Sequence, residues 1–163
     1  MKVLFLDIDG VLNSRRYYES DEWKQISSQL NSDSLKYSPH FLIDRNSIAL
    51  LNQLVQCVPD MKIVVSSTWK RYGGYELTKG YLVQAGFLYP DSIIDYTPDL
   101  AEPKYCRGDE VQWWLDKHSE VKSYCIVDDD DDMLCNQLNN LVQTSSRLGL
   151  TKEDCEKIRI KLG

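Results

Sequence analysis

The sequence predicts an α/β fold in which helices cover both faces of a mainly parallel sheet. Three observations support this. Short apolar segments alternate with helical patterns along most of the chain, the segments are too uniformly apolar for exposed strands, and acidic or hydroxyl residues follow directly after three of them. Such alternation indicates βαβ units, whose parallel strands are joined by helical crossovers. The result is a three-layer, Rossmann-like arrangement with its ligand site at the carboxyl ends of the strands.

Five short, mostly apolar segments are expected to form the strands. They are residues 3–6, 63–65, 92–96, 124–127 and 141–144. Apolar residues recur at helical spacing in 48–58, 77–85 and 111–118, and Pro59 and Gly86 follow the first two as stop signals. A last helix begins after Thr151, because Thr151 and Asp154 form a capping-box pattern.

The length fits one domain over residues 1–163, since domains usually hold about 100–200 residues. Residues 13–43 are polar and irregular, and a domain needs at least about 50 residues. We therefore expect only a small flap or insert at about 14–43. Hydrophobic residues make up 42% of the chain and charged residues 27%, which excludes a disordered or fibrous protein.

Neither a cleaved secretion signal nor membrane insertion is expected, and secretion without a cleaved signal stays open. The apolar run at 3–6 is shorter than the about 7–15 residues of a signal-peptide core. No run reaches the about 18 residues that span a bilayer. Five cysteines without a Cys-x-x-Cys pair argue against a disulfide framework. These features predict a cytoplasmic protein.

Two carboxylates, Asp7 and Asp9, directly follow the first expected strand, and Gly10 comes next. Glycine lets the chain turn sharply at this point. Two acids at neighbouring backbone positions can take different roles in one site. Turns are also commonly rich in Asp and Gly, so the tetrapeptide alone does not decide between a site and a turn.

Five consecutive aspartates at 128–132 directly follow the expected strand at 124–127. Adjacent carboxylates repel one another unless they are solvated or neutralised. Their position after an apolar strand favours a metal site over a solvated loop, and oxygen ligands favour Mg²⁺ or Ca²⁺. An EF-hand loop beginning at Asp128 is excluded, because Met133 stands where Gly is required and Asn139 where Glu is expected.

Hydroxyl and basic residues could complete such a site. Ser66 and Ser67 follow the strand at 63–65, where hydroxyl and backbone N–H groups can hold phosphate oxygens or cap a helix. Lys104 and Arg107 precede the expected helix near Gly108, where a cation could reach a phosphate. Each of these features is weak when taken alone.

Together, in this order, the four elements resemble the haloacid dehalogenase (HAD) superfamily of phosphohydrolases. The first motif is a hydrophobic strand ending in Asp-x-Asp-Gly, and the second is a strand ending in Ser66. The third is a Lys or Arg, either Arg107 or Lys104, and the fourth is a strand ending in an acidic pair. The segment Ser-Ser-Thr-Trp-Lys at 66–70 is similar to a subgroup found in RNA-repair-type proteins. The resemblance spans most of the chain.

The resemblance implies a Mg²⁺-dependent phosphomonoester phosphatase. Asp7 would be the nucleophile that forms an aspartyl-phosphate, and Asp9 the general acid and base. The metal ligands would be Asp7, the backbone carbonyl of Asp9, and Asp128 or Asp129; Asp128 with Asp132 is the alternative pair. Catalytic contacts to phosphate are expected from Ser66 and from Arg107 or Lys104, and substrate-binding contacts from Gly10, Asn13, Ser67 and Lys70.

The same resemblance implies a nearly capless enzyme, since no second long insert lies between Ser66 and Arg107. An open site suits a large phosphorylated substrate, either a phosphoprotein, including one with phosphotyrosine, or a nucleic-acid end. The alternatives are an inactive binding module of the same fold and a phosphate-accepting signalling domain. Of the 25 acidic residues, seven lie in the first motif and the aspartate run. The other 18 are nearly equal in number to the 19 basic residues of the chain. The net charge of −6 therefore does not exclude nucleic acid as a partner.

Overall fold

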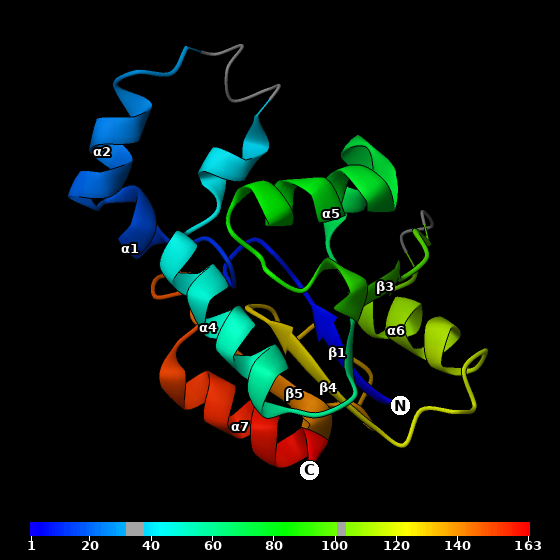
Figure 1. Ribbon diagram of the computed structural model, residues 1–163. Coiled ribbons are helices and arrows are strands. Elements are labelled where there is room, and N and C mark those ends of the chain that lie inside the picture. Colours follow the sequence, from blue (N-terminus) through cyan, green and yellow to red (C-terminus); the bar gives the residue numbers. More distant parts are fainter. Residues whose placement is uncertain (32–37, 101–103) are drawn as a thin grey trace.

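The computed structural model describes residues 1–31, 38–100 and 104–163, and forms three layers around one parallel sheet (Figure 1). The strands are β1 (Lys2–Leu6), β2 (Met61–Val65), β3 (Ile93–Tyr96), β4 (Ser123–Asp128) and β5 (Leu141–Gln143). Their spatial order is β3-β2-β1-β4-β5, and every neighbouring pair is parallel. The predicted α/β class is confirmed, and each expected strand is present to within two residues at either end.

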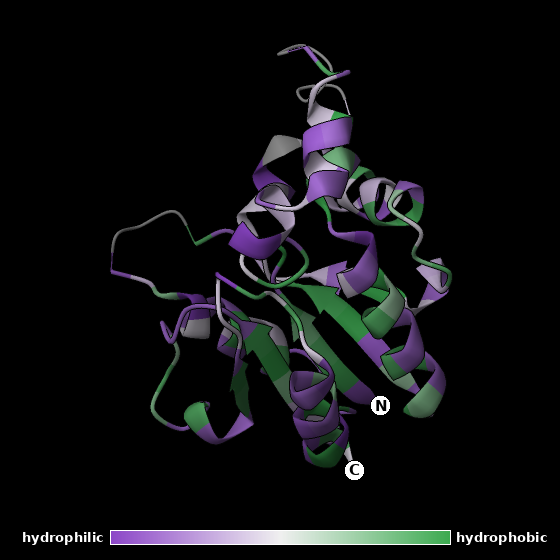
Figure 2. Cartoon of the chain, turned by 90° about the vertical axis from the view of Figure 1, so that its left-hand side faces the viewer, coloured by the Kyte–Doolittle hydropathy of each residue, from purple (hydrophilic) through white to green (hydrophobic). Residues whose placement is uncertain are grey.

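Alternate residues of the strands face opposite helical layers. Leu4 and Leu6 of β1 pack in a large apolar cluster with residues of α4 (Arg45–Cys57), α5 (Gly74–Gln84) and α7 (Lys152–Leu162). Val3 and Phe5 point to the other face and pack with α6 (Arg107–Leu115). Both faces of the strands are thus apolar, as parallel sheets require, and Figure 2 shows the strands in green between purple-striped helices.

Local sequence signals account for the helix ends. Asp44 caps α4, its Oδ1 accepting a hydrogen bond from the Asn46 N–H at 2.8 Å. The capping box predicted for α7 is present, because the Thr151 hydroxyl accepts from the Asp154 N–H and the Asp154 carboxylate accepts from the Thr151 N–H.

Helix α6 begins at Arg107, one residue before the predicted start near Gly108. It ends at Leu115, before the end of the apolar stripe at His118. His118 still lies on the same side, because its ring stacks on Trp114 at a centroid distance of 3.6 Å.

The segment expected to form a flap contains α1 (Arg15–Tyr18), α2 (Asp21–Ser27) and the 3₁₀ helix η1 (Pro39–Leu42). Positions 32–37 of that expected insert lie outside the described residues. Helices α1 and α2 stand beyond the end of the sheet toward which β1 and β4 run (Figure 1). The Arg15 N–H donates to the Ser146 carbonyl at 3.0 Å and the Arg16 N–H to the Arg147 carbonyl at 2.8 Å, so the segment is tied to the core at two places. Within the segment, the Tyr17 hydroxyl donates to the Phe41 carbonyl at 2.8 Å.

Three further 3₁₀ helices occur in the connections: η2 (Thr68–Tyr72), η3 (Pro90–Ser92) and η4 (Leu138–Asn140). Within the described part of the chain, no helix has the length and apolar character needed to cross a membrane.

Candidate active site

The strand order reverses between β1 and β4, and acidic residues gather at this point. Strands β2 and β3, which follow β1 in the chain, lie on one side of it, and the later strands β4 and β5 lie on the other side. The connections that leave β1 and β4 therefore run in opposite directions along the sheet. Such a switch point opens a crevice at the carboxyl ends of the strands. The Asp7 N–H donates to the Val127 carbonyl at 3.0 Å, which places Asp7 at the end of β1 beside Asp128, the last residue of β4.

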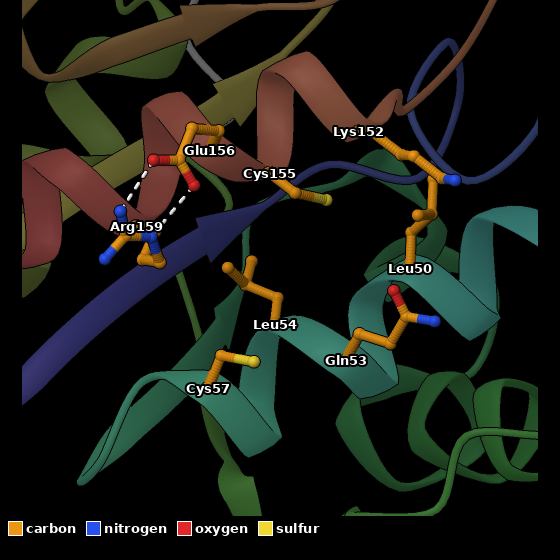
Figure 3. A pocket seen from close by; sticks show the side chains of 8 residues that line it. All are labelled: Leu50, Gln53, Leu54, Cys57, Lys152, Cys155, Glu156 and Arg159. Carbon is orange, nitrogen blue, oxygen red and sulfur yellow. Dashed lines mark hydrogen bonds and ion pairs between the residues drawn. The ribbon is translucent and has the colours of Figure 1, made fainter.

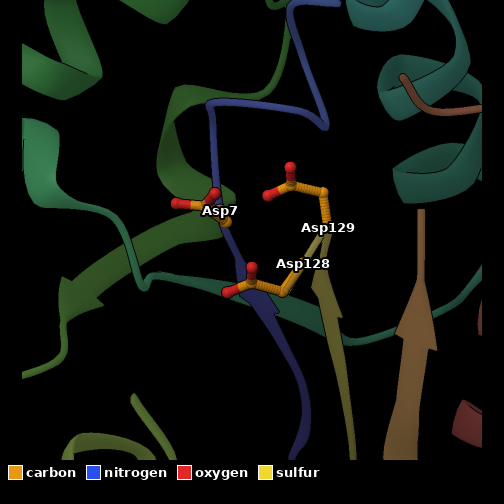
Figure 4. Close-up of side chains that lie close together, drawn as sticks. All are labelled: Asp7, Asp128 and Asp129. Carbon is orange, nitrogen blue, oxygen red and sulfur yellow. The ribbon is translucent and has the colours of Figure 1, made fainter. Parts of the chain in front are cut away.

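Asp7, Asp128 and Asp129 each contribute a carboxylate oxygen to a group whose ligand atoms all lie within 4.8 Å of one another. Figure 4 shows the three side chains converging from the ends of β1 and β4. Burial raises the pKa of Asp7 to about 7, and the charge of Asp128 adds to the effect. Burial likewise raises the pKa of Asp128 to about 6, while Arg107 opposes the shift.

Arg107 lowers the pKa of both carboxylates but does not offset the effect of their burial. A bound cation would offset this effect, and all-oxygen ligands suit Mg²⁺. The group therefore fits the metal implied by the sequence. The Asp9 carboxylate is directed elsewhere, so Asp9 could contribute only its backbone carbonyl, as the sequence-based prediction has it.

Gly10 allows the first loop to approach Asp129. Its φ is +73°, and a Cβ at this position would lie 2.2 Å from the Asp129 Cγ. The Gly10 N–H donates to the Asn13 Oδ1 at 2.9 Å, and its carbonyl accepts from the Thr144 hydroxyl at 2.9 Å. A side chain here would push Asp129 away from Asp7 and Asp128. The predicted contacts of Gly10 and Asn13 with substrate stay predictions.

Asp9 is exposed and held by donors from two separate elements. Its Oδ1 accepts from the Asn13 amide at 2.7 Å, and its Oδ2 accepts from the Trp69 indole N–H at 3.0 Å. Burial raises the pKa of the neighbouring Tyr18 to about 12, and the negative charge of Asp9 adds to the shift. Asp9 thus lies at the accessible rim of the site, where a proton donor to a leaving group would stand.

The two serines after β2 both reach the site. The Ser66 N–H donates to the Leu6 carbonyl at 2.8 Å, which aligns Ser66 with Asp7. The Ser66 hydroxyl oxygen is buried and has no hydrogen-bond partner among the described residues. The Ser67 hydroxyl donates to Asp7 and lowers its pKa. A buried hydroxyl without a partner is costly, so Ser66 is available to a bound anion.

Of the two candidate cations, Arg107 is the one seen beside the acidic group. Its Nε lies 3.8 Å from the Asp128 Oδ2, and another guanidinium nitrogen lies 3.7 Å from Glu110. Lys104 is exposed, with its ammonium 4.9 Å from the centre of the Tyr105 ring. The geometry favours Arg107 as the cation of the third motif.

Lys70 forms a buried ion pair with Glu110, the same carboxylate that Arg107 contacts. Its ammonium donates to Glu110 at 2.7 Å, to the Thr97 hydroxyl at 2.9 Å and to the Pro98 carbonyl at 2.8 Å. Burial lowers the pKa of Lys70, and the hydrogen bond to Glu110 opposes this shift. Because Glu110 also contacts Arg107, these charges form one chain that ends at Asp128. A contact of Lys70 with substrate would have to replace one of these bonds, and it stays a prediction.

The remaining aspartates of the run have local roles. The Asp132 carboxylate accepts from the Arg107 N–H at 3.2 Å, and its carbonyl accepts from the Gly108 N–H at 3.0 Å, so Asp132 holds the start of α6. The Asp130 N–H donates to the Asp128 Oδ1 at 3.0 Å. This arrangement favours the adjacent pair, Asp128 and Asp129, over Asp128 with Asp132.

Two residues of the site, Thr97 and Glu110, were not identified from the sequence, and Trp69 was identified only as part of the segment 66–70, without its contact to Asp9. Thr97 could have been found by the strand-end rule, because it directly follows β3. Glu110 lies one helical turn after Arg107, a spacing at which charges pair. The contact of Trp69 with Asp9 joins segments that are 60 residues apart, and no local pattern signals it.

A separate small hollow of about 160 Å³ lies between α4 and α7, two helices that cover the same face of the sheet (Figure 3). The Glu156–Arg159 ion pair, Cys57 and Cys155 are among the side chains that line it. None of the site residues described above lines this hollow.

Comparisons with known proteins bear on the family and the fold of the chain. A family model described as the HAD domain in Swiss Army Knife RNA repair proteins matches residues 3–155. The solved HAD domain of the effector protein Lem4 from Legionella pneumophila aligns with a TM-score of 0.55 and 19% identity, covering 99% of this chain and 95% of that one. This likeness shows the fold. No curated protein sequence matches the chain.

The family match covers nearly the whole chain and confirms the resemblance inferred from the four motifs. It supports a phosphohydrolase of the HAD type at the level of the superfamily. The chain belongs to the HAD superfamily, in the family of HAD domains found in RNA repair proteins.

Proposed function

We propose that the protein is a Mg²⁺-dependent phosphomonoester phosphatase that forms an aspartyl-phosphate on Asp7. The observation that carries this proposal is the meeting of Asp7, Asp128 and Asp129 at the switch point of the sheet, with ligand oxygens within 4.8 Å. A bound Mg²⁺ would offset the charge of these carboxylates and of the phosphate, which allows an anionic nucleophile to approach an anionic substrate.

Each proposed step uses a residue of the site. The Asp7 carboxylate attacks phosphorus while the bond to the leaving oxygen breaks, and Asp9 gives that oxygen a proton. Asp9 then takes a proton from the water that attacks the aspartyl-phosphate, which frees Asp7 and releases phosphate. The unpartnered hydroxyl of Ser66 would donate to a phosphoryl oxygen, and Arg107 would stabilise charge as it develops on the phosphoryl group.

For the substrate we propose a phosphorylated end of a nucleic acid. The family description, which refers to RNA repair proteins, supports this class. So does the position of Asp9 at the accessible rim of the site, because a leaving group attached to a large molecule can reach it. A hollow of about 150 Å³ beside the site is lined by Arg71, Arg107, Tyr105 and other residues, and could take a neighbouring anionic group.

Hydrolysis of 4-nitrophenyl phosphate, with Mg²⁺ or with EDTA, tests the reaction. We expect turnover that requires Mg²⁺ and is lost in Asp7→Asn. Asp131→Asn is the matched control, because Asp131 is an exposed acid of the same aspartate run, and it should keep wild-type activity. Equal rates for Asp7→Asn and wild type would refute the role of Asp7.

Oligonucleotides with a 3′- or 5′-phosphate, compared with phosphotyrosine and phosphoserine peptides, test the substrate class. A higher kcat/KM for the oligonucleotides supports the proposal, and a higher value for the peptides overturns it. Absence of turnover on every substrate, in a folded protein that still binds Mg²⁺, would indicate a binding module instead.

A further inference from the structure

Trp69 contacts Asp9 although the two residues belong to different elements. Trp69 lies in η2, two residues beyond Ser67, whereas Asp9 lies in the loop after β1. The indole N–H donates to the Asp9 Oδ2 at 3.0 Å, and the Asn13 amide donates to the Oδ1 at 2.7 Å. We propose that Trp69 is a positioning residue that holds the Asp9 carboxylate in the orientation required for proton transfer. This inference rests on the proposed phosphatase function.

Asp9 needs such a partner because it is exposed. Its loop turns at Gly10, and an exposed carboxylate can rotate among several side-chain orientations. Asn13 belongs to the same loop as Asp9. Trp69 follows β2, so its hydrogen bond ties Asp9 to a separate part of the framework. With one donor on each oxygen, both the direction and the rotation of the carboxylate are set.

The indole is itself firmly held. Trp69 is partly buried against the main apolar cluster, and its ring meets Tyr81 edge to face at a centroid distance of 6.4 Å. Its backbone N–H donates to the Ser67 Oγ at 3.5 Å, and the Ser67 hydroxyl contacts Asp7. The next residue, Lys70, is anchored by its buried ion pair. The segment 67–70 therefore places Asp7 and Asp9 relative to each other.

The indole keeps its own proton throughout the reaction. The proton on the leaving oxygen comes from Asp9, and water later returns one to Asp9. Loss of the indole N–H should therefore slow proton transfer without weakening substrate binding. The fall in reaction rate should be largest for substrates whose leaving group departs poorly unless it is protonated.

Trp69→Phe tests this role, because it keeps an aromatic ring and removes the N–H. Trp113→Phe is the matched control, since Trp113 is 43% exposed on α6. The substrates are phenyl phosphate, which needs the proton, and 4-nitrophenyl phosphate, whose leaving group needs it much less. Trp69→Phe removes one hydrogen bond to a charged group, and this loss should lower kcat for phenyl phosphate about 10- to 100-fold. We expect a clearly smaller fall for 4-nitrophenyl phosphate, an unchanged KM, and no effect of Trp113→Phe.

Three results for Trp69→Phe would overturn the positioning role while leaving the phosphatase function intact. They are an equal fall in kcat for the two substrates, a raised KM with unchanged kcat, and no change at all. If the wild-type protein turns over neither substrate with Mg²⁺, the proposed function fails and this role fails with it.

The indole N–H resonances in a ¹⁵N-labelled sample report on the contact without any turnover. Trp69→Phe removes and thereby assigns one signal, and the spectrum also shows whether the variant is folded. Asp9→Ala should shift the Trp69 signal and leave that of Trp113 in place. An unmoved Trp69 signal would show that the hydrogen bond is absent in solution, and would refute the inference even if Trp69→Phe does not fold.

Discussion

Gly10→Ala should damage both the proposed metal site and the stability of the fold. Alanine at φ +73° adopts a left-handed conformation, which costs about 1–2 kcal/mol. The added Cβ would lie 2.2 Å from the Asp129 Cγ and 2.6 Å from its Cβ. Rotating the Asp129 side chain removes only the first of these clashes, so the backbone must also shift. Forced repacking of this kind costs about 1–3 kcal/mol.

Gly74 provides a matched control. It has the same φ of +73°, and a Cβ there meets nothing within 4 Å among the described residues. Gly74→Ala should therefore lose about 1–2 kcal/mol of unfolding free energy, whereas Gly10→Ala should lose about 2–5 kcal/mol. Since Gly10 acts through a proposed ligand, its variant should also bind Mg²⁺ about 10- to 100-fold more weakly.

Urea denaturation measures the first difference, and isothermal titration with Mg²⁺ measures the second. Gly74→Ala should keep the wild-type affinity for Mg²⁺. If Gly10→Ala loses no more stability than Gly74→Ala and binds Mg²⁺ normally, the close approach of the first loop to Asp129 is not a feature of the folded protein.

Three other outcomes follow from buried charge and helix capping. In the metal-free protein, the unfolding free energy should fall as the pH rises from about 4 to about 7. The pKa values of Asp7 and Asp128 in the folded state, about 7 and about 6, exceed the ordinary value of 3.8, so the folded state holds more protons than the unfolded state in this range. Mg²⁺ should accordingly raise the Tm more at pH 8 than at pH 5, and an equal rise at the two pH values would contradict this. Lys70→Met should cost about 3–5 kcal/mol, because it removes the closer of the two cations beside the buried Glu110 carboxylate. Adding Glu110→Leu should recover part of the loss in a denaturation cycle, and a double variant no more stable than Lys70→Met argues against the pair. Thr151→Ala should cost about 1 kcal/mol through loss of the α7 cap, and unchanged stability on urea denaturation would show that the capping box contributes nothing.

The fold could be predicted because its strands are buried on both faces. A segment such as residues 3–6, uniformly apolar and ended by Asp7, fits a central parallel strand better than an exposed one. The short helices α1 and α2 could not be predicted in the same way. Their aromatic residues pack on one another, as Tyr17 and Tyr18 do with Trp23, and give no apolar stripe facing the main core.

The candidate site was predictable wherever a functional residue lies at the carboxyl end of a strand. Asp7 and Ser66 directly follow β1 and β2, Asp128 is the last residue of β4, and the parallel sheet brings all three to one edge. The choice between Arg107 and Lys104 was open, because both lie near the start of the same helix and only tertiary packing separates them. The contact between Trp69 and Asp9 was equally hidden, since it depends on how two loops fold over the sheet.

The parallel sheet also has a consequence for how the chain folds. Leu6 pairs with both Val65 and Val127, and none of the neighbouring strands described is antiparallel, so no local hairpin can form first and guide the others. Contacts between such distant segments are slow to form, because the entropy of closing long loops is lost before the contacts compensate for it. Asp7 meets Asp128 only once β1 and β4 have paired. Recovery of Mg²⁺ binding during refolding should therefore follow the pairing of β1 with β4, and would report on assembly of the sheet's centre.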